Sequence, residues 1–325
     1  MYKEMYKKIN REMKKLKTLF LGTPAFAIPS LELLYFHPRI ELSLVISMPD
    51  RPAGRGQNLQ SPKVIEYAKT NKIPFFQTEK LSKELDLFNK LIQDPPDLII
   101  VLAFAQFLNE KWLNLPKLGC YNIHTSLLPR HRGAAPIQYA LLNNDDFTGV
   151  TIQKMVKTMD AGDVVAKSLL PIRKWDRYDS LSTRLQFAAA STLEEFIFRL
   201  INQDLEIEKQ DEQFVTFAPT LKKEDGHLKF EEVSAEEILN KFRGLTPWPG
   251  IYFYLDGQRI KILHLQISID YNNKPNSIEI KNKKILVGCK TGTLEILSLA
   301  SEGKGATSAE SFIQGYRGKW NLTLQ

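Results

Sequence analysis

Apolar residues in the first half of the chain fall into short continuous runs separated by longer segments of mixed character. These runs predict strands at residues 18–21, 40–47, 97–103 and 119–124, and residues 24–36, with a proline near their start, predict a helix. Residues 97–103 are almost wholly apolar, which is typical of a parallel strand covered on both faces. This order of elements predicts an α/β fold with a doubly wound, mostly parallel sheet.

The middle of the chain continues with both kinds of pattern. Residues 134–142 predict a helix, and residues 149–156 and 164–171 predict extended segments. A long helix is then expected from about Asp179. Apolar residues at helical spacing indicate a core-facing stripe on it, made of Leu181, Leu185, Ala188, Phe196 and Leu200.

The character of the chain changes after residue 203. Residues 203–222 are polar and lack sustained periodicity, which indicates a linker. Ser234 and Glu237 have the spacing of a capping box and predict the start of a helix. Gly244 is expected just past the end of that helix.

Short alternating runs dominate the last part of the chain. They predict strands at residues 251–255, 258–264, about 277–288 and 293–299. Asp256-Gly257, between the first two, is a strong hairpin signal. Several short strands with turn signals suggest a small β-barrel.

Composition limits the class of protein. A chain of 325 residues with 43% hydrophobic content is long enough for two domains. Its two cysteines lie far apart and belong to no Cys/His cluster, so neither a metal site nor a disulfide framework is expected. The first 17 residues contribute +5 of the formal charge of +7, so overall charge is weak evidence for a nucleic-acid partner. No apolar run approaches the ~20 residues of a membrane span and no export signal is visible, so a cytoplasmic protein without a membrane partner is expected.

Candidate chemistry gathers at the end of the fourth predicted strand. Asn122 and His124 are two residues apart, so their side chains share a face of that strand. The carboxyl end of a strand in an open α/β sheet is where ligands usually bind. Asp160 follows in an Asp-Ala-Gly loop. An amide, an imidazole and a carboxylate can together stabilise an oxyanion and move a proton, although a lone histidine is more often structural.

The wider pattern resembles the folate-dependent formyltransferases. It comprises Asn-x-His at 122–124, Ser-Leu-Leu-Pro at 126–129, Arg-Gly-Ala-Ala-Pro at 132–136 and the Asp-Ala-Gly loop. It is most similar to the members of that family that formylate an aminoacyl-tRNA. The similarity covers essentially the whole chain from about Lys14.

The resemblance implies a reaction and its participants. The donor is 10-formyltetrahydrofolate, and the acceptor is the amino group of methionine on initiator Met-tRNA. Asn122, His124 and Asp160 are the implied catalytic residues, and no metal or protein partner is implied. The loop after the first strand is not Gly-x-Gly-x-x-Gly, which disfavours NAD binding.

The resemblance also implies a fold and a domain organisation. The fold is a formyltransferase-like variant of the Rossmann fold followed by a small OB-like β-barrel domain. The expected parts are a basic N-terminal extension at residues 1–12, a formyltransferase catalytic domain at 13–203, a linker at 204–222 and a tRNA-binding domain at 223–325.

Two segments are implied to line a folate slot, which should be mostly apolar with a few polar groups. One follows the strand at residues 97–103, and the other is the Ser-Leu-Leu-Pro loop. The family usually has Tyr-Gly where this chain has Phe104-Ala105, so side-chain and backbone contacts both stay open there. The implied folate-binding residues are Phe104, Gln106, Phe107, Leu108, Ser126, Leu127, Leu128 and Pro129.

Residues 48–56 combine two prolines, two glycines and two arginines between the second strand and the following helix. Such a loop presents cations that suit phosphate. It resembles the insertion by which the family members that act on Met-tRNA reach the acceptor stem. The implied tRNA-binding residues are Arg51, Arg55 and Lys63.

Rival functions stay open within and outside the family. The enzyme could hydrolyse the formyl-folate, or formylate an amino-sugar nucleotide or glycinamide ribonucleotide. The Arg-rich loop and the β domain argue against a small acceptor. A catalytically idle RNA-binding protein is the rival from another class, and the intact Asn, His and Asp set argues against it.

Overall fold

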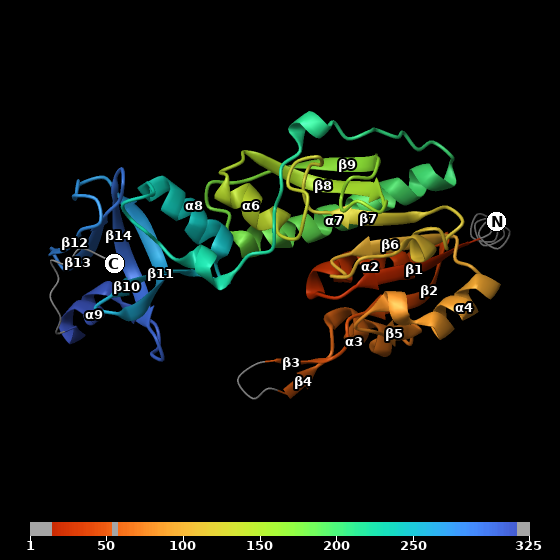
Figure 1. The fold of residues 1–325 in the computed structure, drawn as a ribbon, viewed down its shortest axis with the longest axis horizontal. Coiled ribbons are helices and arrows are strands. Elements are labelled where there is room, and N and C mark those ends of the chain that lie inside the picture. Colours follow the sequence, from red (N-terminus) through yellow and green to blue (C-terminus); the bar gives the residue numbers. More distant parts are fainter. Residues whose placement is uncertain (1–14, 54–57, 317–325) are drawn as a thin grey trace, which may run out of the picture. The chain divides into compact units, whose positions relative to one another are not determined.

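The computed structural model describes residues 15–53 and 58–316, which form two compact units (Figure 1). The first unit takes the chain up to Gly133, together with Phe147–Pro171 and Ser182–Phe217. The second unit takes Ala134–Asp146, Ile172–Leu181 and the chain from Ala218 onward. Each unit is therefore assembled from separate pieces of the sequence.

A seven-stranded sheet forms the centre of the first unit. Its order is β5-β2-β1-β6-β7-β8-β9. The pairings from β5 to β7 are parallel, whereas β7 with β8 and β8 with β9 pair antiparallel. The predicted mostly parallel sheet is confirmed. Its strands are β1 (Leu16–Gly22), β2 (Ile40–Ser47), β5 (Phe75–Gln77), β6 (Leu98–Leu102), β7 (Cys120–His124), β8 (Phe147–Lys154) and β9 (Val164–Pro171).

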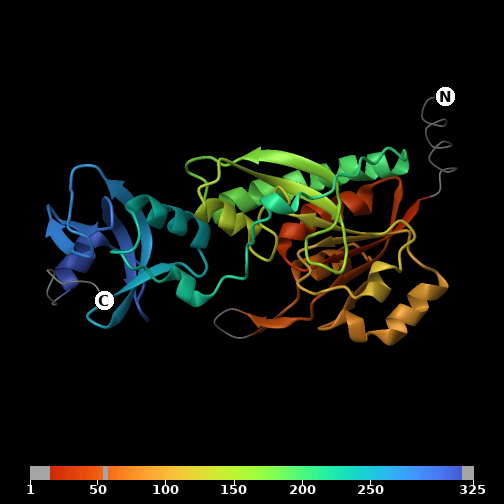
Figure 2. The same cartoon turned by 45° about the horizontal axis from the view of Figure 1, so that its top comes forward.

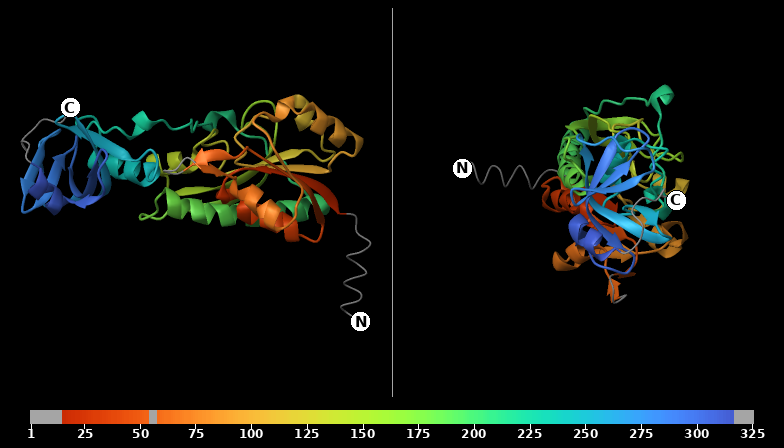
Figure 3. Two further views of the ribbon diagram at one scale, coloured as in Figure 1. Left: turned by 90° about the horizontal axis from the view of Figure 1, so that it is seen from below. Right: turned by 90° about the vertical axis from the view of Figure 1, so that its left-hand side faces the viewer.

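Helices cover both faces of this sheet. They are α2 (Ile28–Phe36), α3 (Lys63–Thr70), α4 (Leu85–Gln93), α5 (Glu110–Leu113) and most of α7 (Tyr178–Ile201), with short 3₁₀ segments η1 (Ala25–Ala27), η2 (Leu81–Lys83) and η3 (Glu212–Phe214). Figure 3 shows α4 on one side of the sheet and α2 and α7 on the other. All five residues of β6 are buried, because a strand covered on both faces needs apolar side chains on both.

A two-stranded hairpin projects from the first unit between β2 and α3 (Figure 2). β3 (Arg51–Ala53) pairs antiparallel with β4 (Asn58–Gln60). The sequence predicted only a loop here. The extended backbone on either side of residues 54–57 is a finding of the structure.

Helix α7 buries a face slightly different from the predicted stripe. Leu181, Leu185 and Phe196 are fully buried, as predicted. Ala189 and Leu193 take the core positions in between, whereas Ala188 is only half-buried. Steps of four residues keep side chains in one row on the helix, and the row from Leu185 therefore runs through Ala189.

The second unit is built on a six-stranded antiparallel sheet. Its main path is β10-β11-β14-β13-β12, and β15 pairs with β14. This confirms the predicted small β domain, and in the part that the structure describes its hydrogen-bonded path is open between β10 and β12. The strands are β10 (Ile251–Leu255), β11 (Gln258–Ser268), β12 (Ile278–Lys281), β13 (Lys284–Gly288), β14 (Thr293–Ser301) and β15 (Thr307–Ser308), and the helical segments are α6 (Pro136–Leu142), η4 (Lys223–Gly226), α8 (Ala235–Leu245) and α9 (Ala309–Gly315).

Two hairpin turns shape this sheet. Asp256 and Gly257 join β10 to β11 with φ of 49° and 73°, as their sequence predicts. The single strand predicted at residues 277–288 is wrong. Asn282 and Lys283 adopt φ of 51° and 63° and split it into β12 and β13.

Helix α8 begins as predicted and ends later. The Ser234 hydroxyl accepts a hydrogen bond from the Glu237 N–H, and the Glu237 carboxylate accepts one from the Ser234 N–H at 2.7 Å. The hydrogen bonds that the carboxylate accepts from the Ser234 N–H and hydroxyl hold the pKa of Glu237 below its usual range. The helix continues to Leu245, so Gly244 lies inside it.

The polar segment after α7 packs on the first unit. Glu208 forms a β-bridge with Val164 of β9, and Phe217 forms one with Arg132. Figure 1 shows the segment running back from the end of α7 past β9. Residues 208–217, called the strap below, are therefore held along the sheet by backbone contacts. Within the described residues, no helix is long and apolar enough to cross a membrane.

Candidate active site

The candidate catalytic residues lie at the carboxyl end of β7, one strand beyond the point where the strand order of the first sheet reverses. The chain runs from β1 outward to β2 and β5 and then returns to β6 on the other side of β1, and ligands of open α/β sheets usually bind near such a reversal at the carboxyl ends of the strands. Asn122 and His124 occupy the third and fifth positions of β7 and share a face. Asp160 comes from the loop between β8 and β9.

The Asp160 carboxylate is the centre of the site's hydrogen bonds. Its Oδ2 accepts from the Gly133 N–H at 2.9 Å, and its Oδ1 accepts from the Gln153 side-chain amide at 2.9 Å. The Asn122 amide nitrogen lies 3.4 Å from the same Oδ1. Asp160 has φ of 52°, a left-handed conformation that aspartate tolerates better than most residues. The structure therefore brings Asn122, His124 and Asp160 together.

His124 is buried, and its two ring nitrogens have different neighbours. Nε2 lies 2.8 Å from the His131 carbonyl oxygen. Because a carbonyl can only accept, Nε2 is assigned the N–H. Nδ1 lies 3.7 Å from Asp160 Oδ1, which is too long for a hydrogen bond. Nδ1 is therefore the nitrogen left to exchange a proton with a substrate.

The Ser-Leu-Leu-Pro loop is held against β8 by Thr151. The Thr151 hydroxyl donates to the Ser126 carbonyl at 2.7 Å and accepts from the Leu128 N–H at 3.1 Å. Ser126 and Leu128 are buried, and the Leu128–Pro129 peptide is cis. Leu127 and Pro129 are half-buried. These two side chains provide the loop's accessible apolar surface.

The segment after β6 mixes core and surface residues. Phe104 and Leu108 belong to the apolar core of the first unit, with 2% and 8% of their surface exposed, whereas Phe107 is 74% exposed. Ala103 and Ala105 are exposed and adopt φ of 52° and 63°. Around Phe104, the accessible surface therefore comes from alanine methyls and backbone.

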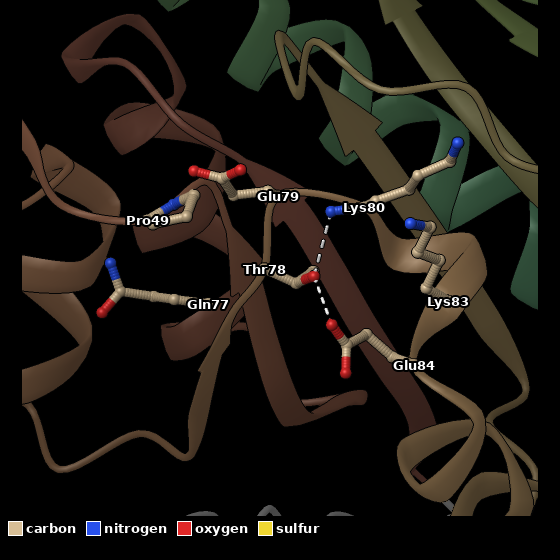
Figure 4. A pocket seen from close by; sticks show the side chains of 7 residues that line it. All are labelled: Pro49, Gln77, Thr78, Glu79, Lys80, Lys83 and Glu84. Atoms are coloured by element: carbon tan, nitrogen blue, oxygen red, sulfur yellow. Dashed lines mark hydrogen bonds between the residues drawn. The ribbon is translucent and has the colours of Figure 1, made fainter.

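Gln106 connects this segment to a pocket at the carboxyl end of β5 (Figure 4). Its amide donates to the Thr78 carbonyl at 2.8 Å, and its carbonyl accepts from the Leu81 N–H at 2.7 Å. The Thr78 hydroxyl in turn donates to the Glu84 carboxylate at 2.6 Å. Gln106 thus positions one wall of this pocket. Its lining residues are Pro49, Gln77, Thr78, Glu79, Lys80, Lys83 and Glu84.

The candidate tRNA contacts lie on the hairpin and the helix that follows it. Arg51 forms an exposed ion pair with Glu79 at 3.2 Å, and Lys63 forms one with Glu66 at 2.8 Å. Exposed ion pairs contribute little free energy, so both cations can exchange their partner for a phosphate. Arg55 lies outside the described residues.

Three residues around Asp160 were given no individual role from the sequence, although Arg132 opens the Arg-Gly-Ala-Ala-Pro motif. Gln153 stands opposite Asn122 in the β7–β8 ladder, and a polar residue at a buried position of β8 was the signal that could have found it. Arg132 and Gln210 reach the site from a loop and from the strap. No periodic pattern marks either residue, because both act through long-range contacts.

In the described part of the chain, the acidic, histidine and cysteine residues form no metal site. Among the residues that the structure describes, no group of three or more His, Cys, Asp or Glu side chains could hold an ion. Cys120 and Cys289 are buried and free, and burial raises the pKa of each thiol to about 12.

Family models and relatives agree with this geometry. The model described as formyl transferase matches residues 19–197, and the model of the formyl transferase C-terminal domain matches residues 220–317. The methionyl-tRNA formyltransferase of Geobacter metallireducens is 38% identical over 305 residues, which cover 94% of this chain and 97% of that protein. The chain belongs to the methionyl-tRNA formyltransferase family. The relative from Natranaerobius thermophilus is 36% identical and is covered over its whole length.

Solved structures show how widely the formyltransferase fold is used. An N-formyltransferase from Helicobacter canadensis, in complex with folinic acid and dTDP-3-aminofucose, aligns with a TM-score of 0.64 at 19% identity, over 86% of this chain and 98% of that chain. HypX from Aquifex aeolicus, in complex with tetrahydrofolic acid, aligns with a TM-score of 0.59 at 17% identity, over 92% of this chain and 47% of that chain. At these identities the likeness concerns the fold alone.

Proposed function

We propose that this chain transfers the formyl group of 10-formyltetrahydrofolate to the amino group of methionine on initiator Met-tRNA, in the cytoplasm. The observation that carries the proposal is the meeting of Asn122, His124 and Asp160 at the carboxyl end of β7. Membership of the methionyl-tRNA formyltransferase family supports the choice of acceptor.

The reaction needs a hydrogen-bond donor to the oxyanion and a group that carries a proton. The neutral amine attacks the formyl carbon, and the carbonyl electrons move to the oxygen. Collapse of the tetrahedral species breaks the bond between the formyl carbon and N10 of the folate. The amine gives up one proton and N10 takes up one, so protons balance.

Asn122 is suited to the oxyanion. Its amide carries two N–H groups, and Asp160 Oδ1, at 3.4 Å, can engage only one of them. The second can donate to the formyl oxygen, where its effect grows as negative charge develops.

His124 is suited to the proton transfer. Its Nδ1 makes no hydrogen bond to Asp160 at 3.7 Å, while Nε2 fixes the ring through the His131 carbonyl. Asp160 lies beside the ring, with its Oδ1 3.7 Å from Nδ1. At this distance its carboxylate can offset the positive charge that the ring carries when it takes up a proton.

The segment after β6 and the Ser-Leu-Leu-Pro loop can contact the folate in different ways. Leu127, Pro129 and the exposed Phe107 offer apolar surface, and the backbone around Phe104 offers polar groups. Gln106, Ser126 and Leu128 hold the walls by hydrogen bonds. The buried side chains of Phe104 and Leu108 support the slot from the core.

The hairpin is the proposed contact with the acceptor stem. Arg51 lies on β3 and Lys63 on α3, and Arg55 is proposed as the residue that reaches the stem. Two or three such cations would add phosphate contacts whose strength falls with salt.

Formyl transfer assayed with four acceptors tests the proposal. The protein and 10-formyltetrahydrofolate are mixed with charged initiator tRNA, uncharged initiator tRNA, charged elongator Met-tRNA or an amino-sugar nucleotide. We expect rapid transfer to charged initiator tRNA and none to the uncharged tRNA, because the methionine amine is the nucleophile. Preferred transfer to the sugar nucleotide, or hydrolysis without transfer, would overturn the proposal.

A further inference from the structure

The strap is hydrogen-bonded to the loop that carries Asp160. The side-chain amide nitrogen of Gln210 donates to the carbonyl oxygens of Asp160 and Gly162, at 2.8 and 2.7 Å. An amide has two N–H groups, so these two contacts use its donor capacity. A single side chain thus sets the backbone on both sides of Ala161.

Arg132 determines which way the Gln210 amide faces. Its Nε and Nη2 atoms donate to Gln210 Oε1 at 3.0 and 2.8 Å. A flipped amide would place its N–H groups against the guanidinium and its oxygen against the two carbonyls. Both contacts would then be repulsive, so the observed orientation is the one that all partners satisfy.

Glu212 anchors Arg132 at the other end of this chain of contacts. Its carboxylate accepts from Nη1 and Nη2 of Arg132 at 3.2 and 2.8 Å, and these hydrogen bonds hold the pKa of Glu212 below its usual range. Only 6% of the Arg132 side chain is exposed. A buried guanidinium needs such satisfied partners, which makes the whole arrangement rigid.

The neighbours of Arg132 contact both catalytic partners. The His131 carbonyl meets His124 Nε2, and the Gly133 N–H donates to Asp160 Oδ2. The strap holds this same loop, because the His131 N–H donates to the Thr216 hydroxyl at 2.9 Å and the Arg132 N–H to the Thr216 carbonyl at 2.9 Å. The strap therefore reaches His124 and Asp160 through two separate connections.

We propose that Gln210 is a positioning residue for formyl transfer, which holds Asp160 at its working distance from His124 and Asn122 and is itself oriented by Arg132 and Glu212. The inference deepens the proposed function and rests on it for its kinetic readout. Gln210 contacts no reacting atom. Its effect passes through the backbone of residues 160–162, whose left-handed conformation at Asp160 needs support from its surroundings.

Two variants of Gln210 distinguish a role in positioning Asp160 from a role in stability alone. Gln210→Ala removes both sets of contacts. Gln210→Glu keeps an acceptor for Arg132 but replaces the two donors with a carboxylate oxygen that faces the carbonyls of Asp160 and Gly162. The control is Gln213→Ala, an exposed glutamine in the same strap.

Steady-state kinetics with charged initiator tRNA give the first readout. We expect kcat to fall on the order of 100-fold in both Gln210 variants, the scale for a small displacement of a catalytic group. KM for 10-formyltetrahydrofolate should change by less than about threefold, and Gln213→Ala should match the wild type. A Gln210→Glu variant with wild-type kcat, or a loss shared by the control, would overturn the inference.

Hydrogen–deuterium exchange on the full chain gives a second readout that needs no activity. We expect faster exchange in both Gln210 variants only in peptides that contain residues 158–163 and 131–133, with Tm lowered by no more than a few degrees. Faster exchange throughout the chain, or no change in these peptides, would overturn the inference. If the wild type transfers no formyl group to Met-tRNA, the proposed function fails, and the exchange data alone then decide the role of Gln210.

Discussion

Hydrogen-bonded neighbours restrict the orientation of the side chains at the candidate site. Asp160 illustrates the point: Gly133 and Gln153 take one carboxylate oxygen each at 2.9 Å. These two hydrogen bonds favour the observed orientation of the carboxylate. Its separation of 3.7 Å from Nδ1 keeps that nitrogen free for proton transfer. We therefore propose that His124 moves the proton and that Asp160 offsets the charge on its ring.

Asn122→Ala tests the oxyanion role. We expect kcat to fall by about 100- to 1,000-fold, or about 2.7–4 kcal/mol, because one preorganised donor is lost from the transition state. Tm should stay within a few degrees, since Asn122 is only half-buried and makes one long contact, at 3.4 Å. Single-turnover assays with rapid quenching measure the rate of the chemical step directly. A kcat within fivefold of the wild type would exclude the amide as the oxyanion donor.

The two thiols should be unreactive in the native protein. Burial raises the pKa of Cys120 and of Cys289 to about 12, so both stay neutral thiols at pH 8. We expect no reaction with DTNB at that pH until guanidinium is added, when both react. An unfolded thiol ionises near pH 8.5. The folded state therefore binds more protons between that value and about 12, and the free energy of unfolding should fall as pH rises through this window.

Residue patterns predicted much of the site, but not the contacts between residues that are far apart in the sequence. The period of two along a strand predicted that Asn122 and His124 share a face. Asp160 was found only through the resemblance of its loop to the formyltransferases. Gln210 reaches Asp160 across 50 positions of sequence, and such contacts leave no local periodicity to read.

At the scale of elements, most strand and helix positions followed their patterns, while one turn and the end of α8 did not. The predicted β2 and β9 match the structure residue for residue. The turn at Asn282-Lys283 went unnoticed because neither residue is glycine, although both adopt positive φ. Gly244 was taken for the end of α8 because glycine commonly ends helices. Its role is different.

Helix α8 carries Gly244 where it meets α6. A Cβ at this position would lie 3.0 Å from the Gln138 carbonyl oxygen, 3.3 Å from Leu142 and 3.4 Å from Leu141. The first of these is backbone and cannot move aside easily. The absence of a side chain thus lets two helices of the second unit pack closely.

Two glycine substitutions should have effects of opposite sign. Alanine normally stabilises a helix by about 0.8–1 kcal/mol relative to glycine. We expect Gly244→Ala instead to lower the free energy of unfolding by about 1–3 kcal/mol, because the methyl group overpacks the contact with α6. Gly315→Ala, at the end of α9 with nothing within 4 Å, should be neutral or slightly stabilising. Urea titrations measure both, and a stabilising Gly244→Ala would disprove the packing role.

At the scale of the whole chain, the two units are interleaved in sequence. The second unit includes Ala134–Asp146 and Ile172–Leu181, which lie inside the part matched by the first family model. Arg243 of α8 binds both pieces, through the Asn144 side chain and the Asp176 carbonyl. A cut in the linear sequence therefore does not separate one folded unit from the other.

A fragment that ends at Phe217 should be less stable than its length suggests. It keeps the strap and every residue of the candidate active site, but it loses α8, the packing partner of α6. Ile137, Ala140 and Leu141 on α6 are buried in the full chain. Their exposure removes about 1.5–3 kcal/mol of stabilisation for each large apolar side chain. We expect the fragment to show a lower Tm and to bind ANS.

Addition of residues 218–325 as a separate polypeptide provides the control for that experiment. It should restore Tm and suppress ANS fluorescence, because α8 can then cover α6 and Arg243 can bind Asn144 and Asp176 again. A fragment that melts at the temperature of the full chain and binds no ANS would show that α6 needs no cover. In that case the fragment up to Phe217 would be stable without residues 218–325, and the interleaving would concern only the order of the segments along the chain.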